Sequence, residues 1–600
     1  MMRCAPILLA LAGCGAIAYS PEAVHGESAR LNRFLEESFL TRVDRSPQFQ
    51  ARLGIQRDQG AWDDISDAHA REDREITARE LERLRADFDF EKLNGDAQLS
   101  YRLFEYEAER TLERFTWRFH DYPVNQMHGV HANVPAFLES FHRIDDVADA
   151  EAYVERLNGI PRLFDQLIEN LELREELGIL PPAFVFPRVI EDCRNILAGR
   201  PFEPSGADGT ILADFRSKLA RLERLDEATR ERLLGAATAA LTLSVGPAYE
   251  ELIGVLERQS AEATTDAGAW KLPDGDTFYR FALEQATTTR LTPAAVHTLG
   301  LSEVARIHDE MRAIVIGLRF EGDLQDFFRF LREDERFYYP NDDSGRAAYL
   351  RDVKAILESM EARLDELFLT RPKAAMVVKA VEPYRAASAG KAFYQRGTPD
   401  GSRPGTYYAN LYDMTAMPRY QMEALAFHEG IPGHHMQSSI AQELEGLPSF
   451  RKHGHYTAYG EGWGLYAEVV PKEMGFYGDD YSDFGRLAME LWRACRLVVD
   501  TGIHHRRWTR EQAIDYLRRN TPNSEGDCIK AVERYIVMPA QATAYTIGML
   551  KILELRQRAQ DRLGERFDVR VFHDVLLRSG PVPLDVLDEL VEAWIAPADS

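Results

Sequence analysis

The sequence predicts a large, mainly α-helical protein that carries one small β element. Apolar residues recur at helical spacing inside charged segments along much of the chain, whereas the apolar–polar alternation of a half-buried strand is scarce. The chain has 600 residues, of which 45% are hydrophobic and 28% charged. It is therefore long enough for a large core and has the composition of a globular protein.

Four segments are expected to form amphipathic helices because their apolar residues fall on one helical face. In the second of them, Pro161 has no backbone N–H to donate and is expected to break the helix. Clusters of Pro and Gly mark loops between the helical stretches. The helical segments are residues 71–90, 153–167, 215–234 and 349–369, and the loops are residues 181–187, 201–209 and 397–405.

Strand-like stretches are confined to residues 375–380 and 406–411. We expect them to form a small β element just before the segment that is richest in chemistry. Residues 264–275 are rich in Thr, Asp and Gly, which is consistent with a domain boundary near residue 270. Two helical halves that face a cleft would explain the same pattern equally well.

The N-terminus is typical of an exported bacterial lipoprotein. A short positive start precedes an apolar run that is too short to span a bilayer, which indicates a secretory signal over residues 1–13. Leu-Ala-Gly-Cys, ending at Cys14, resembles the lipobox, in which the cysteine becomes the lipidated first residue. We expect a membrane anchor at Cys14, a tether over residues 14–30, and a body on the periplasmic face. Gly15 rather than Asp follows the cysteine, which favours the outer membrane over the inner one; a plain signal peptide with a chance cysteine is the alternative.

Charge and cysteine content exclude several classes of protein. The net charge is -25 and the isoelectric point about 5.2, so the chain has no basic footprint and no nucleic-acid partner is expected. No later segment offers about 18 uninterrupted apolar residues, so no membrane span is expected. Cys193, Cys495 and Cys528 form no CxxC pair and are expected to be buried free thiols, with a disulfide between two of them as the alternative.

His428 and Glu429 form half of a zinc-peptidase signature on an expected helix. In the usual form a second histidine follows at i+4, and the glutamate acts as general base on the water held by the ion. Here the next histidines are His434 and His435, at i+6 and i+7. In a regular helix i+6 lies about 240° around and i+7 about 10 Å along the axis, too far for two nitrogens that must each lie about 2.0–2.1 Å from one ion.

The sequence also supplies the means to interrupt this helix. Pro432 lacks an N–H, and its ring would clash with the carbonyl of His428 in a straight helix. The glycines on either side of Ile431-Pro432 permit unusual dihedral angles. We therefore expect a bulge that returns His434 or His435 to the ion bound by His428.

The third ligand is expected to be Glu461, in the segment Gly-Glu-Gly-Trp-Gly-Leu-Tyr-Ala-Glu that ends at Glu468. Glu461 and Glu468 share one side of a helix but lie two turns apart, so Glu468 is expected to orient a ligand or to face solvent. Two histidines and one carboxylate leave one tetrahedral position open, which is the ligand count of a catalytic zinc site. The same set also suits iron.

Residues 428–437 and 460–466 together resemble the bacterial family DUF885 and, through it, zinc metallopeptidases of the Glu-zincin type. Residues 400–410, 493–504 and 539–548 agree with the same pattern, whereas the N-terminal half agrees only in general character. The resemblance implies one helical domain over residues 31–600 with a deep cleft, one zinc ion and peptide hydrolysis. The family pattern keeps the histidine that corresponds to His434, which favours it over His435.

Two residues are candidate donors to the substrate carbonyl oxygen, on which negative charge develops during attack. They are His504 and Tyr545, both in segments that share the resemblance. Asp500 lies one turn before His504 and is expected to orient it. The alternatives are a backbone-bonded histidine and a tyrosine that packs in the core.

Arginines near the motif are candidate ligands for a substrate carboxylate. Arg403, Arg493 and Arg496 are candidates to bind it bidentately, although structural ion pairing is the favoured role for any one of them. Tyr407 and Asn410 are expected to line the cleft from a strand edge, where a peptide adds by backbone pairing.

Two hypotheses of function follow from the sequence. The first is zinc-dependent hydrolysis of peptide bonds in short peptides, outside the cytoplasm, with Glu429 activating the zinc-bound water. The second is a helical lipoprotein that binds a ligand or partner and holds a metal only for stability, or none. Glu429 favours the enzyme, because a structural metal site needs no general base beside its ion.

Overall fold

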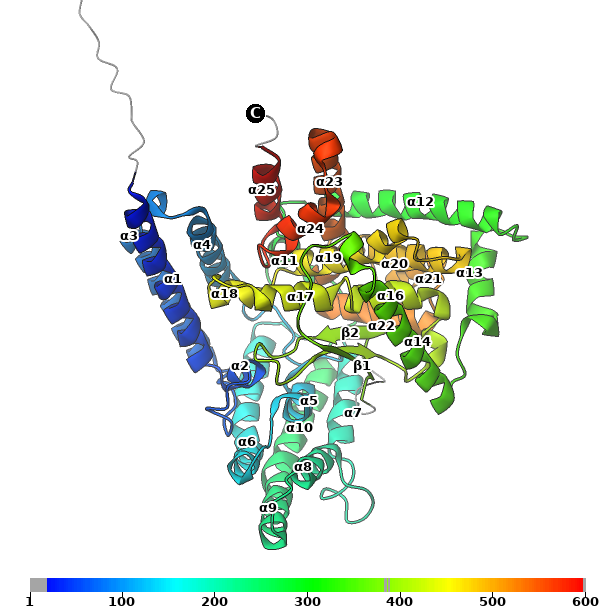
Figure 1. Ribbon diagram of the computed structural model, residues 1–600. Coiled ribbons are helices and arrows are strands. Elements are labelled where there is room, and N and C mark those ends of the chain that lie inside the picture. The colour runs from blue at the N-terminus through cyan, green and yellow to red at the C-terminus, as the bar shows by residue number, and fades with distance from the viewer. Residues whose placement is uncertain (1–18, 383–385, 387–388, 597–600) are drawn as a thin grey trace, which may run out of the picture.

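The computed structural model describes residues 19–382, 386 and 389–596, and helices dominate throughout. In Figure 1 the N-terminal helices stand as an arm at one side, a lower lobe follows, and the remaining helices form an upper body above a small sheet. The arm comprises α1 (Pro21–Asp44), α2 (Pro47–Arg52), α3 (Asp67–Asp87) and α4 (Gly95–Thr116). The lower lobe comprises α5 (Val130–Phe141), α6 (Val147–Glu176), α7 (Val185–Ile196), α8 (Thr210–Ala220), α9 (Glu227–Ala240) and α10 (Gly246–Glu262).

The upper body holds all the helices that follow the lower lobe. Before the sheet these are α11 (Gly275–Thr287), α12 (Pro293–Gly317), α13 (Leu324–Glu333) and α14 (Asp343–Glu361). After the sheet come α16 (Met422–Glu429), α17 (His434–Glu443), α18 (Ser449–Lys452), α19 (Thr457–Val469) and α20 (Asp480–His504). The chain continues through α21 (Arg510–Asn520), α22 (Glu525–Val537), α23 (Ala544–Leu563), α24 (Val569–Leu577) and α25 (Leu584–Ile595).

The predicted tether is too long, because α1 begins at Pro21. The side chain of Ser20 accepts a hydrogen bond from the Ala23 N–H, and proline suits the first helical position. Further along α1, Leu31 and Phe34 are buried in a small core shared with α3 and α4. This capping and burial extend the helix back through residues that the sequence alone assigned to a linker.

Two further helix predictions need correction. Pro161 lies inside α6 and does not end it. Proline costs a helix interior about 3 kcal/mol, and the fully buried apolar stripe around it, which includes Ile160 and Phe164, offsets that cost. Residues 215–234 form two helices rather than one, because Asp226 accepts a hydrogen bond from the Thr229 N–H and starts α9 afresh.

The sheet has three strands in the order β1-β3-β2. β1 (Met376–Ala380) and β3 (Gly405–Ala409) match the predicted strand segments, whereas β2 (Ala392–Gln395) was not expected. β3 pairs in parallel with β1 and antiparallel with β2, so it is the buried central strand. β2 packs against α16 and β1 against α14, which places the sheet directly beneath the first histidine helix.

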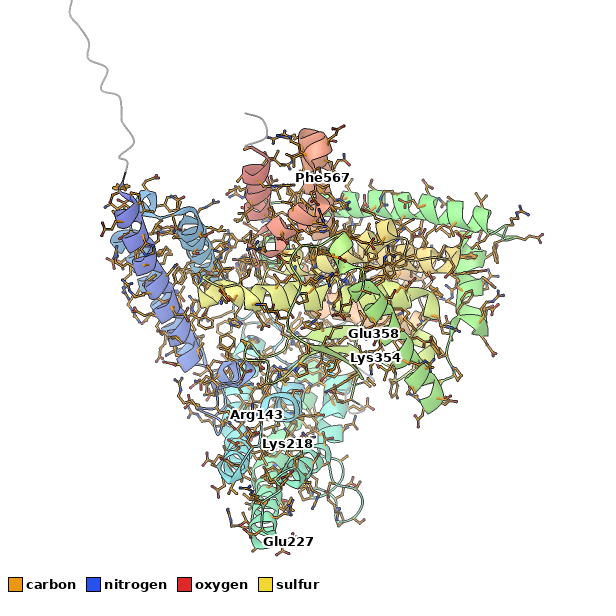
Figure 2. All side chains as sticks on the ribbon, viewed as in Figure 1. Arg143, Lys218, Glu227, Lys354, Glu358 and Phe567 are labelled. Carbon is orange, nitrogen blue, oxygen red and sulfur yellow. The ribbon has the colours of Figure 1, made fainter. Side chains whose placement is uncertain are left out.

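One hydrophobic core joins the lower lobe and the upper body, running from Leu103 to Ile595. At its centre α20 is buried along most of its length and packs against α12, while α19 packs against α23. Many charged side chains lie outside, as Figure 2 shows for Glu227 on α9 and Glu358 on α14, whereas several on α20 are buried. The three cysteines of the described region are buried and free, as predicted.

In the part of the chain that the structure describes, no single helix is long and apolar enough to cross a membrane. Two consecutive segments, Glu525–Val537 and Gln541–Arg566, meet the length and composition test only as a pair bent by 116°.

Candidate metal centre

The predicted helix break lies between the two histidines. α16 ends at Glu429 and α17 begins at His434. Gly433 packs so tightly against the end of α16 that a β-carbon there would lie 2.0 Å from the carbonyl oxygen of His428. The indole Nε1 of Trp463 donates a 2.8 Å hydrogen bond to the Pro432 carbonyl and fixes the loop from α19. As a result the imidazole centroids of His428 and His434 lie 4.7 Å apart.

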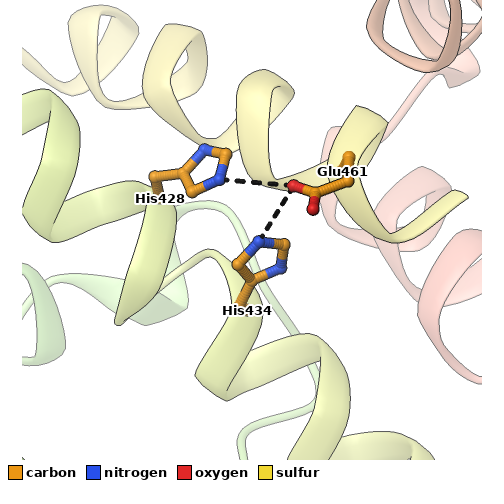
Figure 3. Close-up of side chains that lie close together, drawn as sticks. All are labelled: His428, His434 and Glu461. Atoms are coloured by element: carbon orange, nitrogen blue, oxygen red, sulfur yellow. Dashed lines mark ion pairs between the residues drawn. The ribbon is translucent and has the colours of Figure 1, made fainter. Parts of the chain in front are cut away.

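Glu461 on α19 completes a cluster of three potential metal ligands (Figure 3). Its Oε2 lies 3.6 Å from Nε2 of His428 and 3.3 Å from Nε2 of His434. Ligand atoms at about 2.0–2.1 Å from a tetrahedral zinc ion lie about 3.3–3.4 Å from one another, close to both distances. Among the described residues this is the one group of three His, Cys, Asp or Glu whose ligand atoms lie within 4.8 Å of one another. The donor set and its spacing therefore fit one zinc ion with a fourth position left for water or substrate.

Glycines on α19 allow Glu461 to approach the histidines. A β-carbon on Gly464 would lie 2.8 Å from Cε1 of the His428 ring. Two residues earlier, on the other side of the helix, a β-carbon on Gly462 would lie 2.5 Å from the backbone of Gly548 on α23. A larger residue at either position would separate α19 from the histidine helix or from α23.

Behind the cluster, buried charges hold His428 in place. Its Nδ1 lies 2.8 Å from Oε1 of Glu468, and the same oxygen lies 3.0 Å from Nη2 of Arg493. Glu468 is 1% exposed, so of its two predicted roles the structure selects the orientation of a ligand. A carboxylate on the far nitrogen fixes the ring and turns Nε2 towards the position of the ion.

The electrostatics of the cluster suit a cation. Burial alone would lower the pKa of His428, but hydrogen bonds to Glu461 and Glu468 outweigh it and raise the pKa to about 10. Burial would raise the pKa of Glu461, but its hydrogen bonds to His428 and His434 hold that pKa well below its usual range. Glu461 is therefore ionised, and a metal ion that binds here takes the place of a proton on His428.

Glu429 lies next to this cluster without a hydrogen-bonding partner for one of its oxygens. Its side chain is buried, and its Oε2 has no hydrogen-bond partner among the described residues. Burial raises the pKa of Glu429, and the nearby His428 and His434 offset that only in part. An unpaired buried carboxylate costs stability, so packing alone does not account for it.

His428 and Glu429 line a pocket of about 190 Å³, which is far more than one water molecule needs. The structure brings four of the predicted residues, Tyr545, Arg493, Arg496 and Asn410, to its walls. The Tyr545 ring stacks over His428 with centroids 6.4 Å apart, and its hydroxyl accepts a 3.2 Å hydrogen bond from Arg534.

His435 is turned away from the cluster. Its Nε2 lies 3.1 Å from the carbonyl oxygen of Ala374, and its Nδ1 lies 3.0 Å from the hydroxyl of Tyr394. Both ring nitrogens are therefore engaged beside the sheet. The geometry selects His434 over His435 as the second histidine of the cluster.

His504 is not brought to the pocket, contrary to the expectation from the sequence. It is fully buried in α20, where its Nδ1 accepts from the Ala269 N–H at 2.9 Å and its Nε2 lies 2.9 Å from the Tyr535 carbonyl. Neither nitrogen is left for a substrate. Asp500 does not orient it, because its carboxylate accepts hydrogen bonds from Tyr279 and from the Ala540 N–H. His504 therefore joins α20 to its neighbours.

Of the other predicted substrate contacts, Asn410 reaches the pocket, whereas Arg403 and Tyr407 do not. Arg403 lies over the ring of Phe141 at 4.7 Å and lines a separate pocket. Tyr407 is fully buried in the central strand β3, which pairs on both sides, so the predicted strand edge is wrong. Asn410 reaches the pocket, but its amide donates to the carbonyls of Ala386 and Ala389 and so holds the adjoining loop.

Sequence reasoning did not identify Arg534. It lies on α22, and a single arginine on an amphipathic helix gives no sign of whether it faces solvent or a pocket. The one indication in the sequence is that Arg534 lies close to the segment 539–548, which contains Tyr545.

The fold and the cluster together define a class: a large helical protein with a candidate metal centre of two histidines and one glutamate over a pocket. The chain belongs to the family described as bacterial protein of unknown function (DUF885), whose model matches residues 47–591. Among solved structures, one described as a predicted lipoprotein from Colwellia psychrerythraea is 29% identical, with a TM-score of 0.88 over 95% of this chain and 99% of that one. Another, described as a predicted lipoprotein of unknown function from Shewanella oneidensis, shares the fold at 17% identity, with a TM-score of 0.68 over 93% of this chain and 99% of that one. A search of curated proteins finds no match.

Proposed function

We propose that the protein is a zinc-dependent peptidase that hydrolyses short peptides. The observation that carries the proposal is the buried Glu429, with an oxygen free of hydrogen-bond partners among the described residues, in a pocket it shares with His428. A structural zinc site is closed by four protein ligands and needs no base, whereas three ligands with a neighbouring carboxylate suit hydrolysis.

In this mechanism each residue of the pocket has one task. A bound zinc ion would polarise the scissile carbonyl and lower the pKa of a water molecule. Glu429 accepts a proton from the attacking water and passes it to the leaving nitrogen. The Tyr545 hydroxyl accepts a hydrogen bond from Arg534 and so keeps its own proton to donate to the carbonyl oxygen as negative charge develops. Glu468 and Arg493 keep the His428 ring in position throughout.

The size of the pocket supports short peptides as substrates. Its walls come from α16, α20, α22, α23 and the loops beside the sheet, so the reacting bond has to enter an enclosed space. A volume of about 190 Å³ is below the roughly 300–1,000 Å³ of typical ligand pockets, so it takes the end of a flexible chain rather than a folded domain.

We also propose that the body is held at the periplasmic face by a lipid on Cys14, at the outer membrane. Cys14 lies outside the described residues, so the support is the lipobox-like segment and the description of the Colwellia structure as a predicted lipoprotein. Radiolabelled palmitate incorporation into the wild type and into Cys14→Ala tests this, and equal labelling of the two would contradict it.

The decisive test compares zinc content and peptide cleavage in the wild type and two glutamate variants. Glu429→Gln keeps the shape of the side chain but removes the base, and Glu358→Gln is the matched control at an exposed position on α14 (Figure 2). We expect all three proteins to hold about one zinc ion, and Glu429→Gln to lose about 100- to 10,000-fold in cleavage rate while the control keeps the wild-type rate.

The same experiment decides between the two hypotheses of function. If all three proteins bind zinc and none cleaves a peptide library, the metal is structural and the protein binds a ligand or partner instead. If none binds zinc, the metal centre itself is wrong. Cleavage at the wild-type rate by Glu429→Gln would remove Glu429 from the mechanism.

A further inference from the structure

Two arginines on the wall of the pocket form no ion pair with any carboxylate of the described residues. Arg496 on α20 is 7% exposed, and its Nε and Nη1 have no hydrogen-bond partner there. Arg534 on α22 donates from Nη2 to Gln541 and to the Tyr545 hydroxyl, both neutral groups. A buried guanidinium is normally paired with an anion, because the cost of desolvating its charge is otherwise not recovered.

Other cations of the same pocket are paired. Arg493 lies 3.0 Å from the carboxylate of Glu468, and Lys391 lies 3.3 Å from that of Asp527. The lack of a counter-charge is therefore specific to Arg496 and Arg534 within this set of four. Both charges face the same cavity, so a single anion bound there would compensate both.

Tyr545 connects these arginines to the metal centre. The guanidinium carbon of Arg496 lies 4.3 Å from the centre of the Tyr545 ring, and Arg534 contacts its hydroxyl. The same ring also lies against His428, in a nearly parallel stack with an interplanar angle of 16°. Tyr545 therefore contacts both arginines and the candidate metal ligand His428.

We infer that Arg496 and Arg534 bind the C-terminal carboxylate of a peptide, so that the enzyme removes one residue from the C-terminus. This inference rests on the proposed function. The planar guanidinium matches a carboxylate in shape and charge. One residue spans at most about 3.3–3.6 Å of chain, so a terminal carboxylate fixed at this wall presents the last peptide bond towards His428 and Glu429. Water adds across that C–N bond and yields a free amino acid and a shortened peptide.

A comparison of matched peptides tests the inference on the wild-type protein. One N-acylated peptide is used with a free C-terminus, as its C-terminal amide, and as an amide whose last residue is Glu. The third peptide distinguishes a side-chain carboxylate from the terminal one. We expect kcat/KM for the free acid to exceed that of both amides by at least about 100-fold, because the amides leave the arginine charges unpaired.

Two variants, Arg496→Gln and the exposed control Arg519→Gln, test whether Arg496 is responsible for the preference for the free acid. The Arg519 side chain is 76% exposed on α21. We expect Arg496→Gln to raise KM for the free acid by at least about 10-fold, to hold zinc like the wild type, and to lose most of the preference for the free acid over the amide. Arg519→Gln is expected to match the wild type in all three measurements.

Binding of the same peptides to Glu429→Gln, measured by calorimetry, provides a readout that needs no turnover. Tighter binding of the free acid than of the amide supports the inference, and equal binding overturns it. If the wild type cleaves the acid and the amide equally well, the protein remains a peptidase but not a carboxypeptidase. If neither is cleaved while the acid alone binds, the proposed function fails and the carboxylate site stands.

Discussion

Substitution of Gly464 by alanine tests whether one missing methyl group positions the metal centre. A β-carbon at this position would lie 2.8 Å from Cε1 and 3.1 Å from both ring nitrogens of His428, closer than carbon atoms normally approach. The ring therefore has to move by several tenths of an ångström. A metal site tolerates deviations of only about 0.2 Å in its ligand distances. Changes of this kind beside a ligand typically cost about 10- to 100-fold in metal affinity, which is the expected loss.

Gly460→Ala is the matched control on the same helix. A β-carbon there meets only Oε1 of Gln437, at an ordinary 3.8 Å. Both substitutions replace glycine with the best helix former, which favours the helix by about 1 kcal/mol, so helix propensity affects both variants alike. A competition titration with a chromogenic chelator gives the zinc affinity, and thermal denaturation of the metal-free proteins reports the fold. Equal zinc affinity in Gly464→Ala and Gly460→Ala would refute the argument that Gly464 makes room for His428.

Three further outcomes are expected. Glu468→Gln weakens the support of His428 and of Arg493, so zinc affinity should fall about 10- to 100-fold in the same titration, and an unchanged affinity would show that Glu468 does not orient the ligand. Trp463→Phe leaves the Pro432 carbonyl without its indole donor, so the free energy of unfolding, measured with denaturant, should fall by about 1–3 kcal/mol; a smaller change would mean that the loop is held by other contacts. A zinc ion bound at this site would take the place of the proton on His428, whose pKa is about 10, so protons are expected to compete with zinc below that pH. Apparent zinc affinity should therefore rise about tenfold per pH unit between about pH 7 and 9, and a flat profile over that window would contradict it.

The helical class, two of the three strands and the candidate ligand types followed from local patterns. Helical spacing of apolar residues identified α3, and the strand-like segments matched β1 and β3. Local patterns were less reliable where tertiary contacts opposed them. Pro161 stays inside α6 because the surrounding stripe is buried, and the short strand β2 forms because β3 offers it an edge.

Within the candidate site, the sequence by itself identified the candidate metal ligands. The departure from i+4 spacing required a break after Glu429, and Gly430, Pro432 and Gly433 provided it, so either His434 or His435 was expected beside His428. The family resemblance favoured His434, and the structure places it with His428 and Glu461. The inference of a break works because helix geometry depends only on residues close together in the chain.

Tertiary structure alone decided which of the remaining polar residues face the pocket. His504 and Arg534 both lie on helices near the motif, yet His504 has both nitrogens bonded to backbone while Arg534 borders the pocket. Likewise, Gly464 is required by the His428 ring and Gly460 is not, although both belong to one glycine-rich segment. The physical reason is that exposure, charge pairing and steric contact depend on which helices cross, and those crossings join residues that are far apart in the chain.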